Sequence, residues 1–333
     1  MSCSRLRRWT IGWARNKLLS DLLAKDLIVV IGKGGAGKTT VAAALGATAA
    51  ASGLRTVIAE VSARGDVLSA FAGESKAPAF RERTLAPGLH HISIDPQHAM
   101  QEYLADQLPV RALAEVLVSS RVFTYLTAAT PGMRELLTVG KVWELAQHDR
   151  RTPGAKPYDL VVLDAPATGH GLAILNAPRT FAQAARVGPI ARQGKMIDAL
   201  LGDPARTGIV AVATAEEMPV NEVLDLRATL LADRGMELDV VVANGVLPER
   251  FTAAQAKTVD AAIAATPPGA VRHALHRARS QHARARAQRS QLQRLRSGLG
   301  GEVGVVTLPQ LPVASLGAPE FETLGRRLGG KLR

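Results

Sequence analysis

The stretch Gly32-Lys33-Gly34-Gly35-Ala36-Gly37-Lys38-Thr39 decides the fold, because its spacing matches the phosphate-binding pattern G-x-x-x-x-G-K-[ST]. It follows a continuous apolar run of strand length, Leu27–Ile31, and opens a helical run, Thr40–Ala51. Glycines let the backbone N–H groups of such a loop turn toward phosphate oxygens, and the helix N-terminus adds a favourable dipole. The sequence therefore predicts a nucleotide-phosphate site that comprises Gly34, Gly35, Ala36, Gly37, Lys38, Thr39 and Thr40.

Charged and metal-binding groups accompany this loop. Lys38 stands where a lysine reaches the β- and γ-phosphates, and the Thr39 hydroxyl stands where it can ligate Mg²⁺. A second block, Tyr158–His170, begins as an apolar strand that ends at Asp164, where a carboxylate meets Mg²⁺ or its water shell. We therefore expect ATP and Mg²⁺ as cofactors, with Lys38 and Asp164 as catalytic residues and Thr39 and Asp164 at the metal.

Lys33 adds a second lysine to the loop. The pattern Lys-Gly-Gly-x-Gly-Lys-Thr resembles the deviant form of the phosphate loop. In proteins with that form, the early lysine crosses a dimer interface and contacts the phosphate of the facing subunit. The resemblance implies a dimer with two nucleotides face to face, in which Lys33 is a catalytic residue that stabilises charge on the transferring phosphoryl group.

Short apolar runs alternate with Ala- and Leu-rich helical stretches along the chain. This alternation is typical of an α/β fold with a doubly wound, mostly parallel sheet, here a P-loop NTPase, and continuous apolar runs are typical of strands covered on both faces. The predicted strands are Leu27–Ile31, Thr56–Glu60, His90–Ile94, Leu160–Leu163, Ile209–Ala213, Asp239–Ala243 and Val303–Leu308.

Two segments do not fit simple crossovers between strands. Pro96–His148 contains no convincing strand and predicts a helical subdomain inserted at about residues 96–150. Val271–Leu299 keeps an apolar spacing of three or four residues, which predicts a long helix with a thin apolar stripe and an arginine-rich outside. We expect an N-terminal extension, 1–24, followed by a single P-loop ATPase domain, 25–333.

The net charge of +12 is concentrated in that predicted helix. Eight arginines lie in Arg272–Arg296, and no acidic residue occurs from Ala261 to Gly301. The segment has no aromatic residue to stack on bases, so no nucleic-acid partner is expected. Its arginines form a solvated face, or they meet an acidic partner or an anionic membrane surface. Its three histidines are expected to face solvent: His273, His276 and His282.

Composition excludes several other classes of protein. The chain is 47% hydrophobic, enough for a sizeable core, and has no apolar run near the ~18 residues of a membrane-spanning helix. Cys3 is its only cysteine, which leaves no intrachain disulfide and no cysteine-based zinc site. The N-terminal residues lack the apolar stretch of a signal peptide. We expect a cytoplasmic protein, in a peripheral position at the inner membrane face if the basic helix binds lipid.

Lys33–Thr40 and Asp164-x-Pro-x-Thr-Gly-His170 together resemble the arsenite-pump ATPase (ArsA) family. That family includes the eukaryotic targeting ATPase for tail-anchored membrane proteins and many bacterial homologues, of which this chain would be one. The similarity extends over most of the chain through softer matches at Pro131–Glu135, Glu216–Glu222, Asn244–Pro248 and Leu308–Pro312.

The resemblance implies a dimeric Mg-ATPase whose inserted helices carry a client-binding surface. It also implies that Asn244 contacts the adenine and that the segment containing Pro309 and Leu311 closes over the base. The partners implied are a second copy or a paralogous ATPase, and an unidentified protein client or membrane protein. A switch that senses the γ-phosphate follows Asp164 and comprises Pro166, Thr168, Gly169 and His170.

The first switch departs from the family pattern. Ser62 stands where the family has the aspartate that positions the attacking water, and a hydroxyl is a poor general base. Glu60 or Asp66 would replace it if the backbone shifts. Otherwise the chain is a weakly active or non-hydrolysing subunit of a heterodimer. Because Cys3 is the only cysteine, neither an arsenite site nor a zinc site is expected.

Two other functional classes share this α/β fold. A positioning ATPase of the chromosome-partition or division-site type shares the lysine pair, but those smaller proteins lack Thr168-Gly169-His170 and the long helical insert. A synthetase or small-molecule kinase would need a substrate-specific polar cluster, which the sequence does not contain.

Substitution of Ser62 by aspartate tests the first switch. Ser62→Asp is expected to raise the kcat of ATP hydrolysis by up to the ~10²–10⁴ that general-base assistance contributes. Nucleotide affinity should stay unchanged, since the carboxylate acts on water in the transition state. Steady-state kinetics and nucleotide titration measure both. A fast wild type that Glu60→Gln or Asp66→Asn slows would assign the base to one of those acids.

Overall fold

The computed structural model describes residues 17–61, 65–72, 80–107, 130, 132–152, 154–185 and 187–329. These residues form an eight-stranded sheet in the order β3-β4-β2-β5-β1-β6-β7-β8, parallel except for β3. The strands are β1 (Leu27–Gly32), β2 (Thr56–Glu60), β3 (Arg83–Ala86), β4 (Leu89–Ser93), β5 (Leu160–Asp164), β6 (Thr207–Thr214), β7 (Val240–Val246) and β8 (Gly304–Pro309).

Seven of these strands lie within a few residues of the ranges that the apolar runs predict, and the α/β class is confirmed. β3 was not predicted. It pairs antiparallel with β4 at the edge of the sheet, and its residues are exposed or half-buried. A four-residue edge strand needs no continuous apolar run, which is why the pattern does not reveal it.

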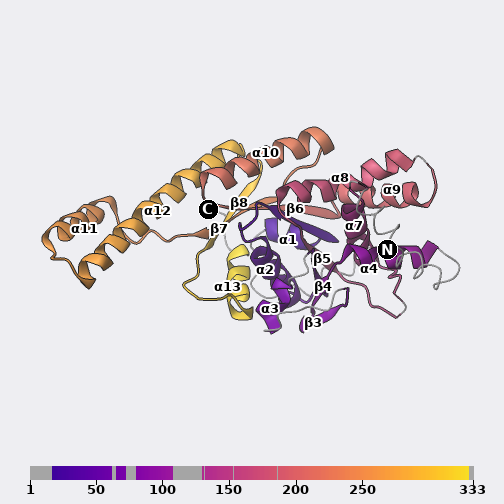
Figure 1. The fold of residues 1–333 in the computed structure, drawn as a ribbon, viewed down its shortest axis with the longest axis horizontal. Helices are drawn as coiled ribbons and strands as arrows, with labels where there is room; N and C mark the ends of the chain where they lie inside the picture. The colour runs from indigo at the N-terminus through magenta and orange to yellow at the C-terminus, as the bar shows by residue number, and fades with distance from the viewer. Residues whose placement is uncertain are drawn as a thin grey trace.

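Helices cover both faces of the sheet (Figure 1). Alternate residues of β1 point to opposite sides: Ile28 and Val30 join one core with α1, α2 and α13, while Val29 and Ile31 join the other with α7 to α10. The helices are α1 (Lys17–Leu23), α2 (Lys38–Ala51), α3 (Asp66–Ala72), α4 (Pro96–Gln107), α7 (Met133–Leu145), α8 (Thr168–Ala185), α9 (Pro189–Gly202), α10 (Glu217–Arg234), α11 (Ala253–Ala265), α12 (Ala270–Gly298) and α13 (Ala318–Leu328).

The structure describes only parts of two predicted segments, the N-terminal extension and the helical insert. Residues 17–23 of the expected extension 1–24 form α1, whose three buried leucines belong to the core. In the expected insert, α4 packs against α7, and α7 packs against α8 and α9. Residues 108–129 and 131 of the insert lie outside the described residues.

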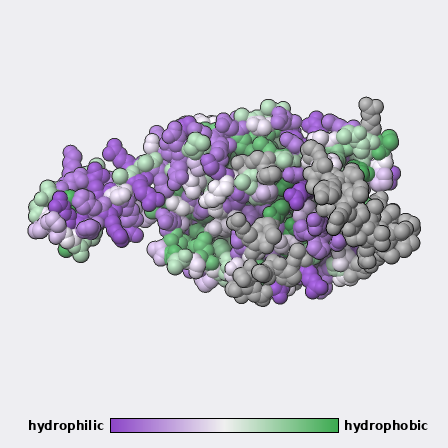
Figure 2. Space-filling view, viewed as in Figure 1, coloured by the Kyte–Doolittle hydropathy of each residue, from purple (hydrophilic) through white to green (hydrophobic). Residues whose placement is uncertain are grey.

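α11 and α12 form an arm that projects from the sheet (Figure 1), and its visible face is largely hydrophilic (Figure 2). Leu292 and Leu295 anchor the inner end of α12 in the core, whereas His273 and His276 are exposed farther out. The prediction that His282 faces solvent is wrong: it is 7% exposed and packs edge-on against Phe251. His282 lies three residues before Ala285 on the buried stripe of α12, so the helical spacing indicates burial, and the expectation of a solvent-facing position rested on its polar side chain. None of the helices in the described ranges has the length and apolar character needed to span a membrane.

Candidate functional site

The loop between β1 and α2 has the shape that its glycines require. Gly35 and Gly37 adopt left-handed conformations, with φ of 81° and 92°. A side chain at Gly37 would also place a Cβ 2.0 Å from the Asn244 amide nitrogen. Gly37 is the N-cap residue of α2 and, as a glycine, has no side chain to cap that helix. The backbone N–H groups at the start of α2 are therefore available to an anion.

Lys38 folds back over this loop. Its ammonium group donates a hydrogen bond to the carbonyl oxygen of Lys33 at 3.1 Å. Burial lowers the pKa of Lys38 below its usual range, and the negative charge of Asp164 opposes that shift. A phosphate in the loop would offer this desolvated cation the counter-charge it lacks.

Asp164 and Thr39 meet at the carboxyl end of the central strands. The Thr39 hydroxyl donates a hydrogen bond to Asp164 Oδ2 at 2.6 Å. Burial raises the pKa of Asp164 to about 7; the bond from Thr39 opposes this rise, and the charge of Glu60 adds to it. The other oxygen, Oδ1, is buried without a hydrogen-bond partner in the described part of the chain. A hydroxyl beside an orphaned carboxylate oxygen is a donor set that suits Mg²⁺.

Lys33 is held by an acidic residue of its own chain. Its ammonium group lies 2.8 Å from Glu222 Oε1, and both side chains are partly exposed. Glu222 comes from α10, in the Glu216–Glu222 segment that sequence comparison singled out without a role. Its second oxygen is buried without a hydrogen-bond partner in the described residues. A lysine that acts across a dimer interface would have to leave this ion pair.

The carboxylate of Glu60 holds the start of α3. It accepts backbone N–H bonds from Asp66 at 3.0 Å and Val67 at 3.3 Å, and lies 3.0 Å from His91 Nε2. Glu60 is buried, whereas Asp66 is exposed. Ser62 lies outside the described residues. Of the two acids considered as a base, Glu60 is therefore occupied by its contacts to the start of α3, and Asp66 is the one accessible to solvent.

The second switch lies against the phosphate loop. Pro166 is half-buried, and Thr168, Gly169 and His170 form the first turn of α8. A Cβ on Gly34 would lie 3.8 Å from the Cβ of Ala167, so the two motifs are neighbours. Nucleotide phosphates in the loop would therefore touch or approach this turn.

Asn244 links the phosphate loop to a cavity at the root of the arm. Its amide donates a hydrogen bond to the Ala36 carbonyl at 3.0 Å. The cavity, of about 490 Å³, has an apolar wall from Leu247, Pro248, Leu311 and Pro312. Pro309, the last residue of β8, precedes this wall. Three arginines that sequence analysis did not assign to the site also line the cavity: Arg250, Arg277 and Arg284.

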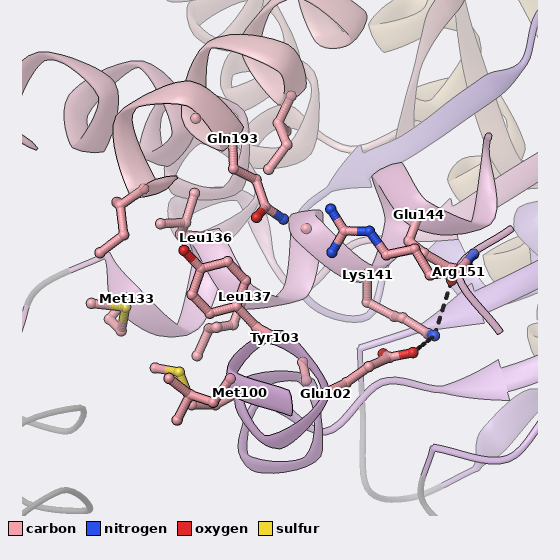
Figure 3. A pocket seen from close by; sticks show the side chains of 16 residues that line it. Met100, Glu102, Tyr103, Met133, Leu136, Leu137, Lys141, Glu144, Arg151 and Gln193 are labelled. Carbon is pink, nitrogen blue, oxygen red and sulfur yellow. Dashed lines mark hydrogen bonds and ion pairs between the residues drawn. The ribbon is translucent and has the colours of Figure 1, made fainter. Parts of the chain in front are cut away.

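A second cavity, of about 210 Å³, lies among α4, α7 and α9 (Figure 3). Its wall is mainly apolar, and at one edge Lys141 pairs with Glu102 at 2.8 Å and Glu144 at 3.0 Å. The apolar lining gathers side chains from all three helices: Met100, Tyr103, Met133, Leu136, Leu137, Ile190 and Ile197.

Comparison with known proteins gives a consistent result. The anion-transporting ATPase family model matches residues 25–192 and 185–262. ATPase BagA of Mycobacterium tuberculosis is 29% identical over 245 residues, which cover 72% of this chain and 69% of that protein. Arsenical pump-driving ATPases of Acidiphilium multivorum and Escherichia coli are 28% identical over 254 residues, which cover 70% of this chain and 41% of each relative. The matched region includes the phosphate loop, Asp164 and Asn244.

Replacement of Asp164 by its amide tests the metal site. Asp164→Asn keeps the shape but removes the charge, so kcat with Mg²⁺ should fall roughly 10²-fold or more. ATP affinity in EDTA should stay close to that of the wild type. Magnesium titrations of ATP binding and turnover measure both effects, with exposed Asp225→Asn as the charge-matched control. A wild-type magnesium response in Asp164→Asn would contradict the assignment.

Proposed function

Because this chain belongs to the anion-transporting ATPase family, we propose that it is a dimeric ATPase that couples ATP hydrolysis to a client through its inserted helices. ATP hydrolysis itself follows from the family and from relatives named as ATPases. The observation that carries the assignment of the site is the Thr39–Asp164 pair beside the loop that holds Lys38.

The residues of this site divide the work of phosphoryl transfer. The loop amides and Lys38 bind and orient the phosphates, and Lys38 offsets their negative charge. Thr39 and Asp164 would hold Mg²⁺, Asp164 through water, and the bound metal would supply further positive charge at the phosphates. Lys33 of each subunit contacts the nucleotide of the facing one. Thr168, Gly169 and His170 respond to the γ-phosphate.

The cavity among α4, α7 and α9 supports a client surface in the insert. Its lining is mainly apolar, and Ile190 of α9, which belongs to that lining, is 40% exposed. Exposed apolar side chains at a cavity mouth are typical of a binding surface. The client is a protein segment or membrane protein that presents apolar side chains to these helices.

The arm offers a surface of different chemistry. α12 contains no acidic residue, so its exposed arginines are suited to an acidic partner or an anionic membrane surface. We propose a cytoplasmic protein, which lies at the inner membrane face if these arginines bind anionic lipid. The second subunit is another copy or a paralogous ATPase; the paralogue is favoured if Ser62 makes this chain weakly active.

Loss of Lys38 tests the nucleotide site. Lys38→Ala is expected to weaken ATP binding by about 3 kcal/mol, roughly 100-fold or more in Kd, because the phosphates lose their main counter-charge. Titration with a fluorescent ATP analogue measures the loss, and circular dichroism checks the fold. Lys257→Ala, at an exposed position of α11, is the control. Undiminished affinity in Lys38→Ala would overturn the site.

The Lys33–Glu222 ion pair yields a paired prediction. Lys33→Ala should retain ATP binding but lose dimer closure and turnover, because the facing phosphates repel each other without it. Glu222→Gln should release Lys33 and raise the fraction of ATP-bound dimer. Sedimentation velocity with ATP measures the dimer fraction of both variants, and steady-state kinetics measures their turnover. A Lys33→Ala variant that hydrolyses ATP at the normal rate as a monomer would rule out the role in trans.

A further inference from the structure

The cavity at the root of the arm combines an apolar wall with three cations. Loops that follow β7 and β8 supply the wall, while Arg277 and Arg284 come from α12. These two arginines are seven residues apart, which places them on one face of the helix two turns from each other. Ser280 and Gln281 lie between them in sequence and also line the cavity.

The cavity lies within reach of the phosphate loop. Asn244 bonds to the loop at Ala36, and Leu247, three residues farther on, lines the cavity. Three residues of chain span at most ~10 Å. α12 is fixed to the same segment, because Gln288 accepts the Leu247 N–H at 2.8 Å and donates to the Gly245 carbonyl at 3.3 Å. A nucleotide with its phosphates in the loop would extend along this segment.

The arginines that line the cavity differ from other arginines of the arm in the charged groups around them. Arg279 pairs with Asp260, and Arg289 pairs with Glu249. The residues that line the cavity in the described part of the chain include no carboxylate. Planar guanidinium groups beside an apolar wall suit a ligand with a flat heterocycle, hydroxyl groups and negative charge.

We propose that Arg277 and Arg284 of α12 are nucleotide-binding residues that contact the base and ribose, so that the bound nucleotide fixes the arm. The inference rests on the proposed nucleotide site and adds a contact from an element outside it. A guanidinium group stacks on the base and donates hydrogen bonds to ribose hydroxyls, while the apolar wall covers the other side of the ring. Arg284 is one turn from Gln288 and therefore lies nearer the phosphate loop than Arg277 does.

The experiment separates base contact from attraction between charges. Kd values for Mg-ATP and for inorganic triphosphate with Mg²⁺ are measured on the full chain and on three alanine variants: Arg277→Ala, Arg284→Ala and Arg286→Ala. Arg286 is the matched control, because it is exposed on the same helix and does not line the cavity. Arg284→Ala should raise the Kd for Mg-ATP roughly ten-fold, and Arg277→Ala should raise it by a smaller factor. Triphosphate affinity should not change in either, and Arg286→Ala should bind both as the wild type does.

Two further measurements complete the test. Arg284→Lys keeps the positive charge but removes the planar guanidinium group. Its ATP affinity should therefore fall nearly as far as that of Arg284→Ala. In the wild type, hydrogen exchange of residues 277–284 should slow on addition of ATP and stay unchanged with triphosphate.

Three results would overturn the inference. The first is an ATP affinity in Arg277→Ala and Arg284→Ala equal to that of Arg286→Ala. The second is an equal loss for ATP and triphosphate, which would reflect charge alone. The third is unchanged exchange of the arm with ATP. In each case Lys38→Ala still reports on the phosphate site, so failure of the arm contact and failure of the proposed function are distinguishable.

Discussion

Burial of negative charge at the carboxyl end of the central strands is the constraint on which the site depends. Asp164 and Glu60 stand at paired positions of β5 and β2, and both are buried. Burial of a carboxylate is costly unless hydrogen bonds or cations compensate it. Glu60 obtains that compensation from two backbone N–H groups and His91, whereas among the described residues the carboxylate of Asp164 has one bond, from Thr39. The incomplete compensation of Asp164 is what makes this position suited to a cation.

The neighbouring contacts join separate elements to the phosphate loop. Lys33 reaches α10 through Glu222, and Ala36 reaches β7 through Asn244. Asp164 lies beside β2, whose last residue, Glu60, holds α3. A ligand that moves Lys33 or the loop therefore alters contacts with several elements at once. Short bonds between packed elements are the physical basis on which a local change at the phosphates would spread.

The sequence predicted the elements better than the contacts. Continuous apolar runs located seven strands, because strands buried on both faces leave that local signal. β3 was missed because an edge strand can be short and polar. The phosphate loop and Asp164 were recognisable because their roles depend on local spacing. The Lys33–Glu222 pair and the contact between Glu60 and His91 join residues distant in sequence, and no local pattern encodes them. His282 lies on the buried stripe of α12, so its spacing indicated burial although its polar side chain did not.

The arm shows how a helix with little apolar surface is held. α12 has 29 residues and no acidic side chain, so opposite-charge pairs within the helix cannot stabilise it. Its inner end is fixed by Leu292, Leu295 and Gln288. Farther out, an ion pair between Arg279 and Asp260 joins α12 to α11. The described residues that line the cavity include arginines and no carboxylate, and like charges on one helix repel each other. A base that stacks on Arg277 or Arg284 and ribose hydroxyls that accept their hydrogen bonds would give these side chains partners in the cavity, which gives α12 a physical reason to respond to nucleotide.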